Sequence, residues 1–212
     1  MKDTKYHPDW QKNRISFLLT KYNESFFKDK NILELGPYNG YIGARFKEMG
    51  ANVKSVEGRQ SNIDNKIKVD YPDYDCVQGN LDTKDWIWGK HDIIINFGLY
   101  YHLTYNHKEH LINCINNCKL LFFETVVYNS FESEIYNTKR VGDDQALTDI
   151  DGYPTEKYIE DIFKELNVKY VKYADKALNG GMHIYDWELN NSKIFHDAQR
   201  RLWVVENANY IP

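Results

Sequence analysis

Residues 32–40 read Ile-Leu-Glu-Leu-Gly-Pro-Tyr-Asn-Gly, and this stretch decides the fold. Its apolar run is typical of a buried strand, which turns sharply at Gly36 before a helix begins. A second short run at 52–56 ends in Glu57. A strand, a glycine turn, a helix and a second strand that ends in an acid describe half of a nucleoside-binding fold. The glycines let the backbone approach a ligand, and the acid accepts hydrogen bonds from both ribose hydroxyls.

The spacing of the glycines argues against a dinucleotide site. Such sites use Gly-x-Gly-x-x-Gly so that a helix N-terminus faces a pyrophosphate, whereas here Glu34 precedes Gly36, Gly40 and Gly43. A generic αβ turn is the alternative interpretation. The pattern acid-x-Gly-x-x-x-Gly resembles motif I of the class I S-adenosylmethionine (SAM) dependent methyltransferases, which implies a turn that wraps the methionine and ribose of SAM. Where many members have a central glycine this chain has Tyr38, whose side chain would either point away from the sulfur of SAM or pack over it and narrow the site.

The composition predicts the class of protein. The chain has 212 residues, 42% hydrophobic and 27% charged, so we expect one soluble α/β domain with a sizeable core. The net charge is −4 without a lysine or arginine block, so no nucleic-acid partner is expected. No apolar run approaches the roughly 20 residues of a membrane span, and the first six residues lack the apolar core of a signal peptide. With Cys76, Cys114 and Cys118 interpreted as buried thiols, we expect a cytoplasmic protein without a membrane partner.

Alternating apolar and amphipathic stretches predict a Rossmann-like, doubly wound α/β fold with a seven-stranded, mostly parallel sheet. The expected strands span residues 31–35, 52–56, 74–77, 91–97, 120–127, 168–173 and 182–189. The expected helices span residues 10–27, about 39–49, from 61 onward, 106–118 and 155–166. The resemblance implies the strand order 3-2-1-4-5-7-6, with the final strand antiparallel.

We expect a single domain with an N-terminal helix. Residues 1–30 would form an N-terminal helical cap, and residues 31–212 the methyltransferase domain. Residues 128–153 interrupt the pattern with a polar, acidic segment. Long excursions inside compact α/β domains are commonly functional. We therefore predict that this insertion, together with the C-terminal segment, forms a lid over the substrate.

Residues 79–82, Gly-Asn-Leu-Asp, follow the third strand. The resemblance implies that Asn80 or Asp82 binds the adenine amino group while Leu81 flanks the ring. Asp82 is also interpretable as a helix cap, and the two roles are compatible. The resemblance implies SAM as cofactor, S-adenosylhomocysteine (SAH) as product, and cofactor contacts from Glu34, Gly36, Tyr38, Gly40, Glu57, Gly58, Asn80, Leu81, Asp82, Asn96 and Gly98.

Residues 96–103, Asn-Phe-Gly-Leu-Tyr-Tyr-His-Leu, form the tip of the fourth strand. They resemble the G-x-L-[YH]-H-L signature of many small-molecule methyltransferases and the tip found in a tRNA wobble-uridine carboxymethyl transferase family. The resemblance implies that Tyr101 and His102 project toward the methyl group. An alcohol acceptor must lose a proton, so we predict His102 as the general base and Tyr101 as a second catalytic residue. A histidine that only holds the loop is the alternative.

The acceptor side is predicted from later segments. Tyr185-Asp186-Trp187 followed by Arg200-Arg201-x-Trp203 resembles the C-terminal pattern of a bacterial and phage-type methyltransferase group. Arginine side chains bind phosphate or carboxylate groups. The alternative for Arg200 and Arg201 is a pair of solvated surface charges. The alternative for His183 is a strand histidine whose hydrogen bonds are made within the protein. The predicted substrate-binding residues are Glu124, His183, Arg200 and Arg201. No metal is expected, because helix-surface histidines such as His107 and His110 are far commoner than ligands.

These patterns predict a SAM-dependent methyltransferase that acts on an oxygen or nitrogen of a small metabolite, such as a sugar, nucleotide-sugar or capsule precursor. Its partner would be this small-molecule acceptor. One alternative is an RNA or protein methyltransferase with a basic groove around Arg140, Arg200 and Arg201. Others are a non-catalytic SAM-binding protein and, less in keeping with the glycine spacing, a nicotinamide oxidoreductase. The sequence does not indicate an oligomeric state.

Overall fold

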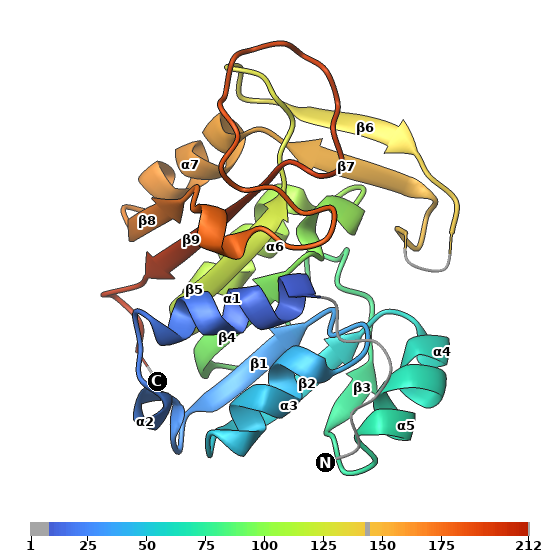
Figure 1. The fold of residues 1–212 in the computed structure, drawn as a ribbon, viewed down its shortest axis with the longest axis vertical. Helices are drawn as coiled ribbons and strands as arrows, with labels where there is room; N and C mark the ends of the chain where they lie inside the picture. The colour runs from blue at the N-terminus through green and yellow to red at the C-terminus, as the bar shows by residue number, and fades with distance from the viewer. Residues whose placement is uncertain (1–8, 143–144, 212) are drawn as a thin grey trace.

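The computed structural model describes residues 9–142 and 145–211. Its main sheet has seven strands in the order β3-β2-β1-β4-β5-β9-β8 (Figure 1). Only β9 runs antiparallel to its two neighbours. The predicted fold class and strand order are thus confirmed, with β9 as the seventh strand. In sheet order the strands are Cys76–Gln78, Asn52–Glu57, Asn31–Leu35, His91–Phe97, Cys118–Val126, Arg200–Glu206 and Lys169–Tyr173.

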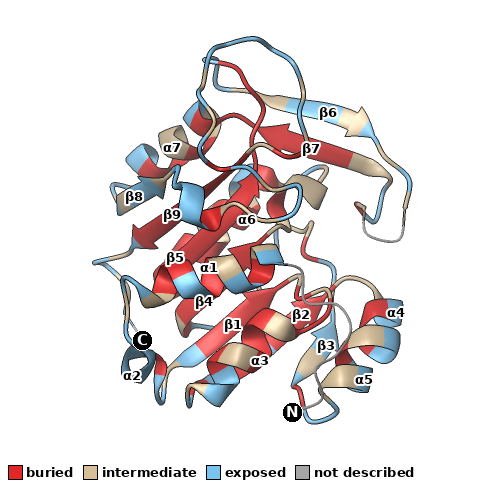
Figure 2. Ribbon diagram, in the orientation of Figure 1, coloured by how far each residue is buried: buried red, intermediate tan, exposed pale blue. Residues whose placement is uncertain are grey.

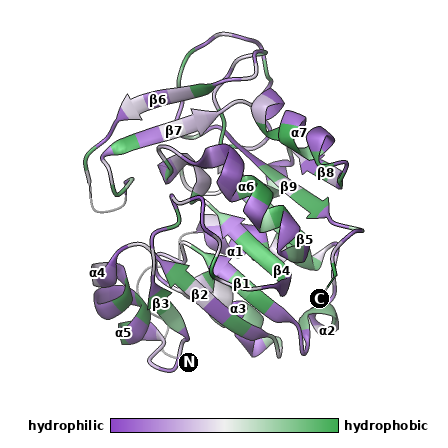
Figure 3. Ribbon diagram, turned by 180° about the vertical axis from the view of Figure 1, so that it is seen from behind, coloured by the Kyte–Doolittle hydropathy of each residue, from purple (hydrophilic) through white to green (hydrophobic). Residues whose placement is uncertain are grey.

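Helices cover both faces of the sheet, because the central strands are apolar on both sides. Ile93 and Ile95 of β4 pack in one core cluster with α1 and α3, while Ile94 packs in the other with α6 and α7. In Figure 2 the central strands of the sheet are formed largely by buried residues. Seen from behind, β4 and β5 are largely hydrophobic, whereas α4 and α5 are largely hydrophilic (Figure 3). The main helices are Asp9–Leu19 (α1), Tyr41–Glu48 (α3), His107–Asn116 (α6) and Glu156–Glu165 (α7).

Shorter helical pieces complete the chain. The predicted helix over 10–27 is interrupted after Leu19, and Glu24–Phe27 (α2) follows with Asn23 as its N-cap. The helix after β2 comprises Gln60–Asn62 (α4), a π-helical turn and Lys68–Asp70 (α5). Residues 1–8 of the predicted N-terminal cap, and Asp143 and Asp144 of the acidic segment, lie outside the described residues. Within the described ranges, every helix is too short or too polar to cross a bilayer.

The last strand was predicted at the wrong place. Residues 182–189 make only isolated bridges, and Met182 is 70% exposed. The strand is instead β9, whose buried run from Leu202 to Val205 pairs with β5 on one side and β8 on the other. A strand between two neighbours must be apolar on both faces, and residues 202–205 meet that condition better than 182–189.

The polar segment at 128–153 contains two strands that sequence analysis did not predict. Ile135–Lys139 (β6) and Ile150–Pro154 (β7) pair as an antiparallel hairpin beyond the carboxyl ends of the main strands (Figure 1). Residues 151–154 of β7 are buried. Thr155 then caps α7, within the helix predicted over 155–166, since its side chain accepts a hydrogen bond from the Tyr158 amide at 3.1 Å.

Candidate active site

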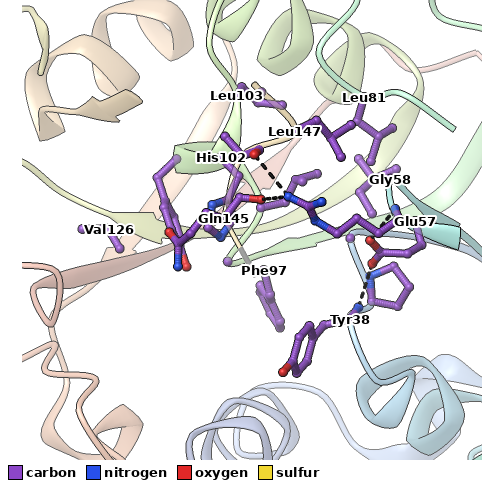
Figure 4. Close-up of a pocket in the computed structure, with 18 of the residues that line it drawn as sticks. Tyr38, Glu57, Gly58, Leu81, Phe97, His102, Leu103, Val126, Gln145 and Leu147 are labelled. Atoms are coloured by element: carbon purple, nitrogen blue, oxygen red, sulfur yellow. Dashed lines mark hydrogen bonds between the residues drawn. The ribbon is translucent and has the colours of Figure 1, made fainter. Parts of the chain in front are cut away.

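A cavity of about 640 Å³ opens at the carboxyl ends of β1, β2 and β4 (Figure 4). Ligands of doubly wound sheets bind at this edge, where the strand order reverses. Most of the predicted site residues line the cavity: Glu34, Gly36, Tyr38, Glu57, Gly58, Asn80, Leu81, Asp82, Gly98, Tyr101, His102, His183 and Arg200. Four predicted residues do not line it: Gly40, Asn96, Glu124 and Arg201.

The turn after β1 has a backbone that favours glycine. Gly36 has φ +65°, and a Cβ there would lie 3.1 Å from the Cβ of Leu99, in the loop after β4. The turn therefore brings the bare backbone of β1 close to the tip of β4. Gly40, with φ +75°, is the N-cap of α3 and does not line the cavity, and its predicted contact with the cofactor stays a prediction.

Glu34 lies beneath this turn and is buried. Its Oε2 accepts hydrogen bonds from the Tyr74 hydroxyl at 2.6 Å and from Ser55 Oγ at 3.3 Å. Burial raises the pKa of Glu34 to about 7, although the hydrogen bonds from Tyr74 and Ser55 partly oppose the shift. The motif I acid thus forms part of the cavity floor and ties β1 to β2.

Glu57, at the tip of β2, links three segments of the cavity wall. Its Oε2 accepts from the Tyr38 amide at 3.1 Å, and its Oε1 accepts from the Arg59 amide at 3.0 Å and from Asn62 Nδ2 at 3.2 Å. A carboxylate has about four acceptor sites. Oε2 therefore retains capacity for one further donor, such as a ribose hydroxyl. Sequence analysis missed Asn62 as a partner.

Asp82 holds the loop that follows β4. Its carboxylate accepts hydrogen bonds from the amides of Thr104 at 2.9 Å and Asn106 at 2.9 Å, and from Tyr105 at 3.2 Å. The three amides belong to the loop before α6, and residues 83–90 form no helix, so Asp82 holds a loop and does not cap a helix of its own. Little acceptor capacity remains for a ligand. Leu81 and Leu147 lie beside Gly58 and form an apolar corner of the cavity (Figure 4). That corner suits a flat, apolar ring.

His102 pairs with a buried acid from the hairpin. Its Nδ1 donates to Asp151 Oδ1 at 3.0 Å, and Asp151 is fully buried. Asp151 also accepts from the Ala146 amide at 3.1 Å and from the Tyr153 hydroxyl at 2.9 Å. With Nδ1 as donor, Nε2 is the acceptor nitrogen, and it has no hydrogen-bond partner among residues 9–142 and 145–211. Sequence analysis missed Asp151, because nothing in the acidic segment marks it as buried.

Tyr101 packs beside this pair. Its ring stacks on Tyr153 with centroids 5.7 Å apart and lies 4.0 Å from the ring of His102. Its hydroxyl accepts a hydrogen bond from Arg200 Nη2 at 3.3 Å. Tyr101 therefore connects His102 to a group of buried charges at the cavity wall.

These charges form what we call the arginine cluster: Arg14, Glu124 and Arg200. Glu124 Oε2 lies 2.7 Å from Arg14 Nη2, and Glu124 Oε1 lies 3.1 Å from Arg200 Nη1. Arg14, on α1, was not predicted. Arg14 Nη2 also donates to His183 Nδ1 at 3.3 Å. Burial, and then the charges of Arg200 and Arg14, lower the pKa of His183, so its ring is neutral.

Arg201 and Asn96 have structural roles away from the cavity. Adjacent strand residues point to opposite faces, so Arg201 faces α7, where its Nε lies 2.7 Å from Glu156 Oε1. Asn96 Nδ2 donates to His110 Nε2 at 2.9 Å. His107 Nε2 in turn donates to the Gly152 carbonyl at 3.1 Å. No group of three or more potential metal ligands gathers anywhere in the described ranges.

No protein-family model and no curated protein matches the chain. Solved structures match over most of its length. The N-terminal domain of EvdMO1, crystallised with SAH and D-fucose, has a TM-score of 0.66 and 13% identity, covering 97% of this chain and 85% of that one. A SAM-dependent methyltransferase from Clostridium acetobutylicum has a TM-score of 0.63 and 14% identity, covering 92% and 91%. The magnesium protoporphyrin IX methyltransferase of Synechocystis, with bound SAM, has a TM-score of 0.59 and 10% identity, covering 93% and 78%. The chain thus has the fold of class I SAM-dependent methyltransferases.

Proposed function

We propose that the protein is a SAM-dependent methyltransferase that methylates a hydroxyl group of a small-molecule acceptor. The observation that carries the proposal is a single cavity that reaches from the Glu57 carboxylate to the imidazole of His102. One end has the acid and the apolar corner that a nucleoside requires. The other end has a base held by a buried acid. Solved neighbours with this fold contain SAM or SAH, which supports the choice of cofactor.

The described residues fit SAM. Oε2 of Glu57 would accept a ribose hydroxyl, the corner formed by Leu81 and Leu147 would hold adenine, and the backbone at Gly36 and Gly98 would adjoin the methionine. When bound, SAM supplies a methyl group attached to a positively charged sulfur. The leaving group is the neutral thioether SAH, which keeps that sulfur. The cavity aligns the acceptor with that methyl group, and alignment is the main requirement of such a displacement.

His102 supplies the proton acceptor. A hydroxyl oxygen must lose its proton during or soon after its attack, and Nε2 of His102 would take it. Asp151 fixes the tautomer through Nδ1 and stabilises the imidazolium that forms, in the same way that a buried acid supports histidine in hydrolases. An amine acceptor would need only to be neutral. The His102–Asp151 pair therefore favours oxygen over nitrogen.

Two segments beside the cavity also have a role in the proposed reaction. We propose that the 128–153 insertion acts as a lid and that α1, within the N-terminal 1–30 region, closes the opposite side. The lid segment is anchored beside the ribose site, since Arg59 Nη2 donates to the carbonyls of Gly142 at 3.3 Å, Gln145 at 3.1 Å and Ala146 at 3.3 Å. A covered site excludes water from the reaction.

The alternative of a nucleic-acid or protein substrate loses its support. The basic groove expected around Arg140, Arg200 and Arg201 does not form, because Arg200 and Arg201 are buried and paired with Glu124 and Glu156. A small hydroxylated acceptor, such as a sugar derivative, matches a cavity of about 640 Å³ better.

The test has two stages. Calorimetry with SAH should detect binding to the wild type and a loss of roughly 10-fold or more in Glu57→Ala, because hydrogen bonds to charged groups contribute about 1.5–3 kcal/mol. Asp64→Asn, at an exposed acid on the neighbouring helix, is the matched control and should bind normally. Transfer of a labelled methyl group from SAM to a panel of sugars and nucleotide-sugars should then identify the acceptor. Absence of SAH binding by the wild type would refute the proposal.

A further inference from the structure

Two histidine rings line the cavity with opposite hydrogen-bonding character. Arg14 Nη2 lies 3.3 Å from His183 Nδ1, and because a guanidinium group only donates, Nδ1 of His183 is the acceptor in this contact. A neutral imidazole that accepts at Nδ1 carries its proton on Nε2. His102 has the opposite tautomer, since its Nδ1 donates to Asp151. The cavity wall therefore contains an acceptor nitrogen on His102 and an N–H donor on His183.

The charges around His183 keep its ring neutral. Arg14 and Arg200 carry permanent positive charges, and the fully buried Glu124 is paired with both of them. Burial, and then the positive charges of the two arginines, lower the pKa of His183. The ring therefore does not take up a second proton in the pH range where histidine ordinarily titrates. His183 cannot serve as the base of the reaction, but it remains a hydrogen-bond donor while His102 accepts a proton.

The ring of His183 is also held in a fixed orientation. It packs against Trp10 with ring centroids 4.8 Å apart and an interplanar angle of 39°. Trp10 and Arg14 lie about one turn apart on α1, so this helix fixes both a face and an edge of the imidazole. In the part of the chain that the structure describes, Nε2 of His183 has no hydrogen-bond partner, and the ring is only partly buried. The N–H is thus free to bind a ligand.

The two histidines border the same part of the cavity. The ring of Tyr101 lies 4.0 Å from that of His102, and its hydroxyl accepts a hydrogen bond from Arg200 at 3.3 Å. Arg200 is in turn close enough to His183 for its charge to lower the pKa of that ring. A ligand that lies against Tyr101 and Arg200 is therefore flanked by the two histidines.

A donor and an acceptor on the wall of one cavity select a ligand that matches both. The hydroxyl that receives the methyl group gives its proton to His102, and a lone pair of the same oxygen attacks the methyl carbon. A further donor to that oxygen would stabilise it before the attack and so would not accelerate the reaction. The N–H of His183 therefore suits a different oxygen of the acceptor.

We infer that His183 is a fixed hydrogen-bond donor that binds a second oxygen of the acceptor, next to the hydroxyl that His102 deprotonates. The inference rests on the proposed function for the reaction, and it narrows the acceptor to a polyol such as a sugar, in which neighbouring carbons carry oxygens. An alcohol with a single oxygen would displace water from the N–H of His183 without replacing its hydrogen bond. A donor left unpaired in this way disfavours the wrong ligand.

The tautomer of His183 is tested first, in the wild type without ligand. Two-bond correlation of ring nitrogens and protons by NMR distinguishes an Nε2–H from an Nδ1–H imidazole, and His183→Gln assigns the signal. Spectra are recorded between about pH 5 and pH 8, where an ordinary histidine titrates. His183 should remain neutral with its proton on Nε2 throughout. A proton on Nδ1, or protonation within this range, would overturn the inference.

The second oxygen is tested with the methyl glycosides of galactose, glucose and mannose and with the monodeoxy derivatives of each. The measured quantity is kcat/KM for methyl transfer from SAM. In the wild type, loss of the hydroxyl next to the methylated one should lower kcat/KM roughly 10-fold or more. In His183→Phe the same loss should have little effect, because the donor is already absent. His183→Gln keeps an N–H donor and should retain the discrimination.

His196→Phe is the matched control, because His196 is an exposed histidine of the same C-terminal segment and does not line the cavity. It should discriminate between the glycosides as the wild type does. Circular dichroism checks that each variant is folded. If His183→Phe does not fold, the comparison of deoxy derivatives in the wild type and the tautomer measurement still test the inference.

Three results would count against a second oxygen at His183. The wild type could be indifferent to loss of the neighbouring hydroxyl, or wild type and His183→Phe could lose the same factor in kcat/KM. Either result would overturn the inference. If SAH binds but none of the glycosides is methylated, the polyol acceptor is wrong. If the wild type does not bind SAH, the proposed function fails instead, and the tautomer of His183 still decides whether its ring is a donor.

Discussion

Replacement of Glu34 by glutamine should remove a pH dependence of stability that the wild type carries. The buried carboxyl has a pKa of about 7 in the folded protein, against the ordinary value of 4.5. Its stabilising contribution is therefore fully present below pH 4.5 and is lost as the pH rises through 7, because ionisation is easier in the unfolded chain. The rise of this pKa from 4.5 to about 7 corresponds to roughly 3 kcal/mol of unfolding free energy, of which about 2–3 kcal/mol is lost between pH 5 and pH 8.

The assay is urea unfolding without ligand at intervals from pH 5 to pH 8, with tryptophan fluorescence as the signal that monitors unfolding. The quantity of interest is the difference in unfolding free energy between wild type and Glu34→Gln, since buried histidines act in the opposite direction in both proteins. Burial lowers the pKa of His110 to about 4, for example. Glu48→Gln, at an exposed acid of α3, is the control and should show no such trend. A difference that stays constant within about 0.5 kcal/mol would refute burial of an ionisable Glu34.

Four further outcomes are expected. His102→Ala should lower kcat by roughly 10²–10⁴-fold on a hydroxyl acceptor, measured as SAH release, and equal turnover would exclude His102 as base. Asp151→Asn should change kcat more than it changes KM, with a lower kcat and an altered pH–rate profile. An unchanged profile would show that Asp151 has no role in catalysis. Glu124→Gln should lower the unfolding free energy by roughly 3–5 kcal/mol in the absence of ligand, because it leaves two buried guanidinium groups unpaired, and a loss below 1 kcal/mol would contradict that reading. Gly36→Ala should cost about 1–2 kcal/mol through its positive φ, with weaker SAH binding by calorimetry, whereas wild-type values would show that the turn tolerates a side chain.

The parts of the fold that sequence analysis predicted well are those encoded locally. The turn at Gly36, the acid at Glu57 and the buried strand over 91–97 each occupy a short continuous stretch, and their spacing alone predicts a common edge of the sheet. Thr155 is a further local signal, since an N-cap depends only on its own first turn.

The parts that were missed depend on contacts between distant segments. Asp151 lies 49 positions from His102, and Arg14 lies 110 positions from Glu124, so no local pattern marks either pair. The final strand was misplaced for the same reason, because its position depends on what pairs with β5. Once Arg200 and Arg201 are placed in a strand, period-two geometry requires that only one of them face the cavity.

Insertion of β9 between β5 and β8 has a consequence for biosynthesis. Until residues 200–206 leave the ribosome, β5 and β8 both present open edges that can pair with other chains. Arg200 belongs to the same segment, so the arginine cluster acquires its second guanidinium only when β9 joins the sheet. A nascent chain that stalls before this point is therefore both incomplete at its ligand site and prone to aggregation.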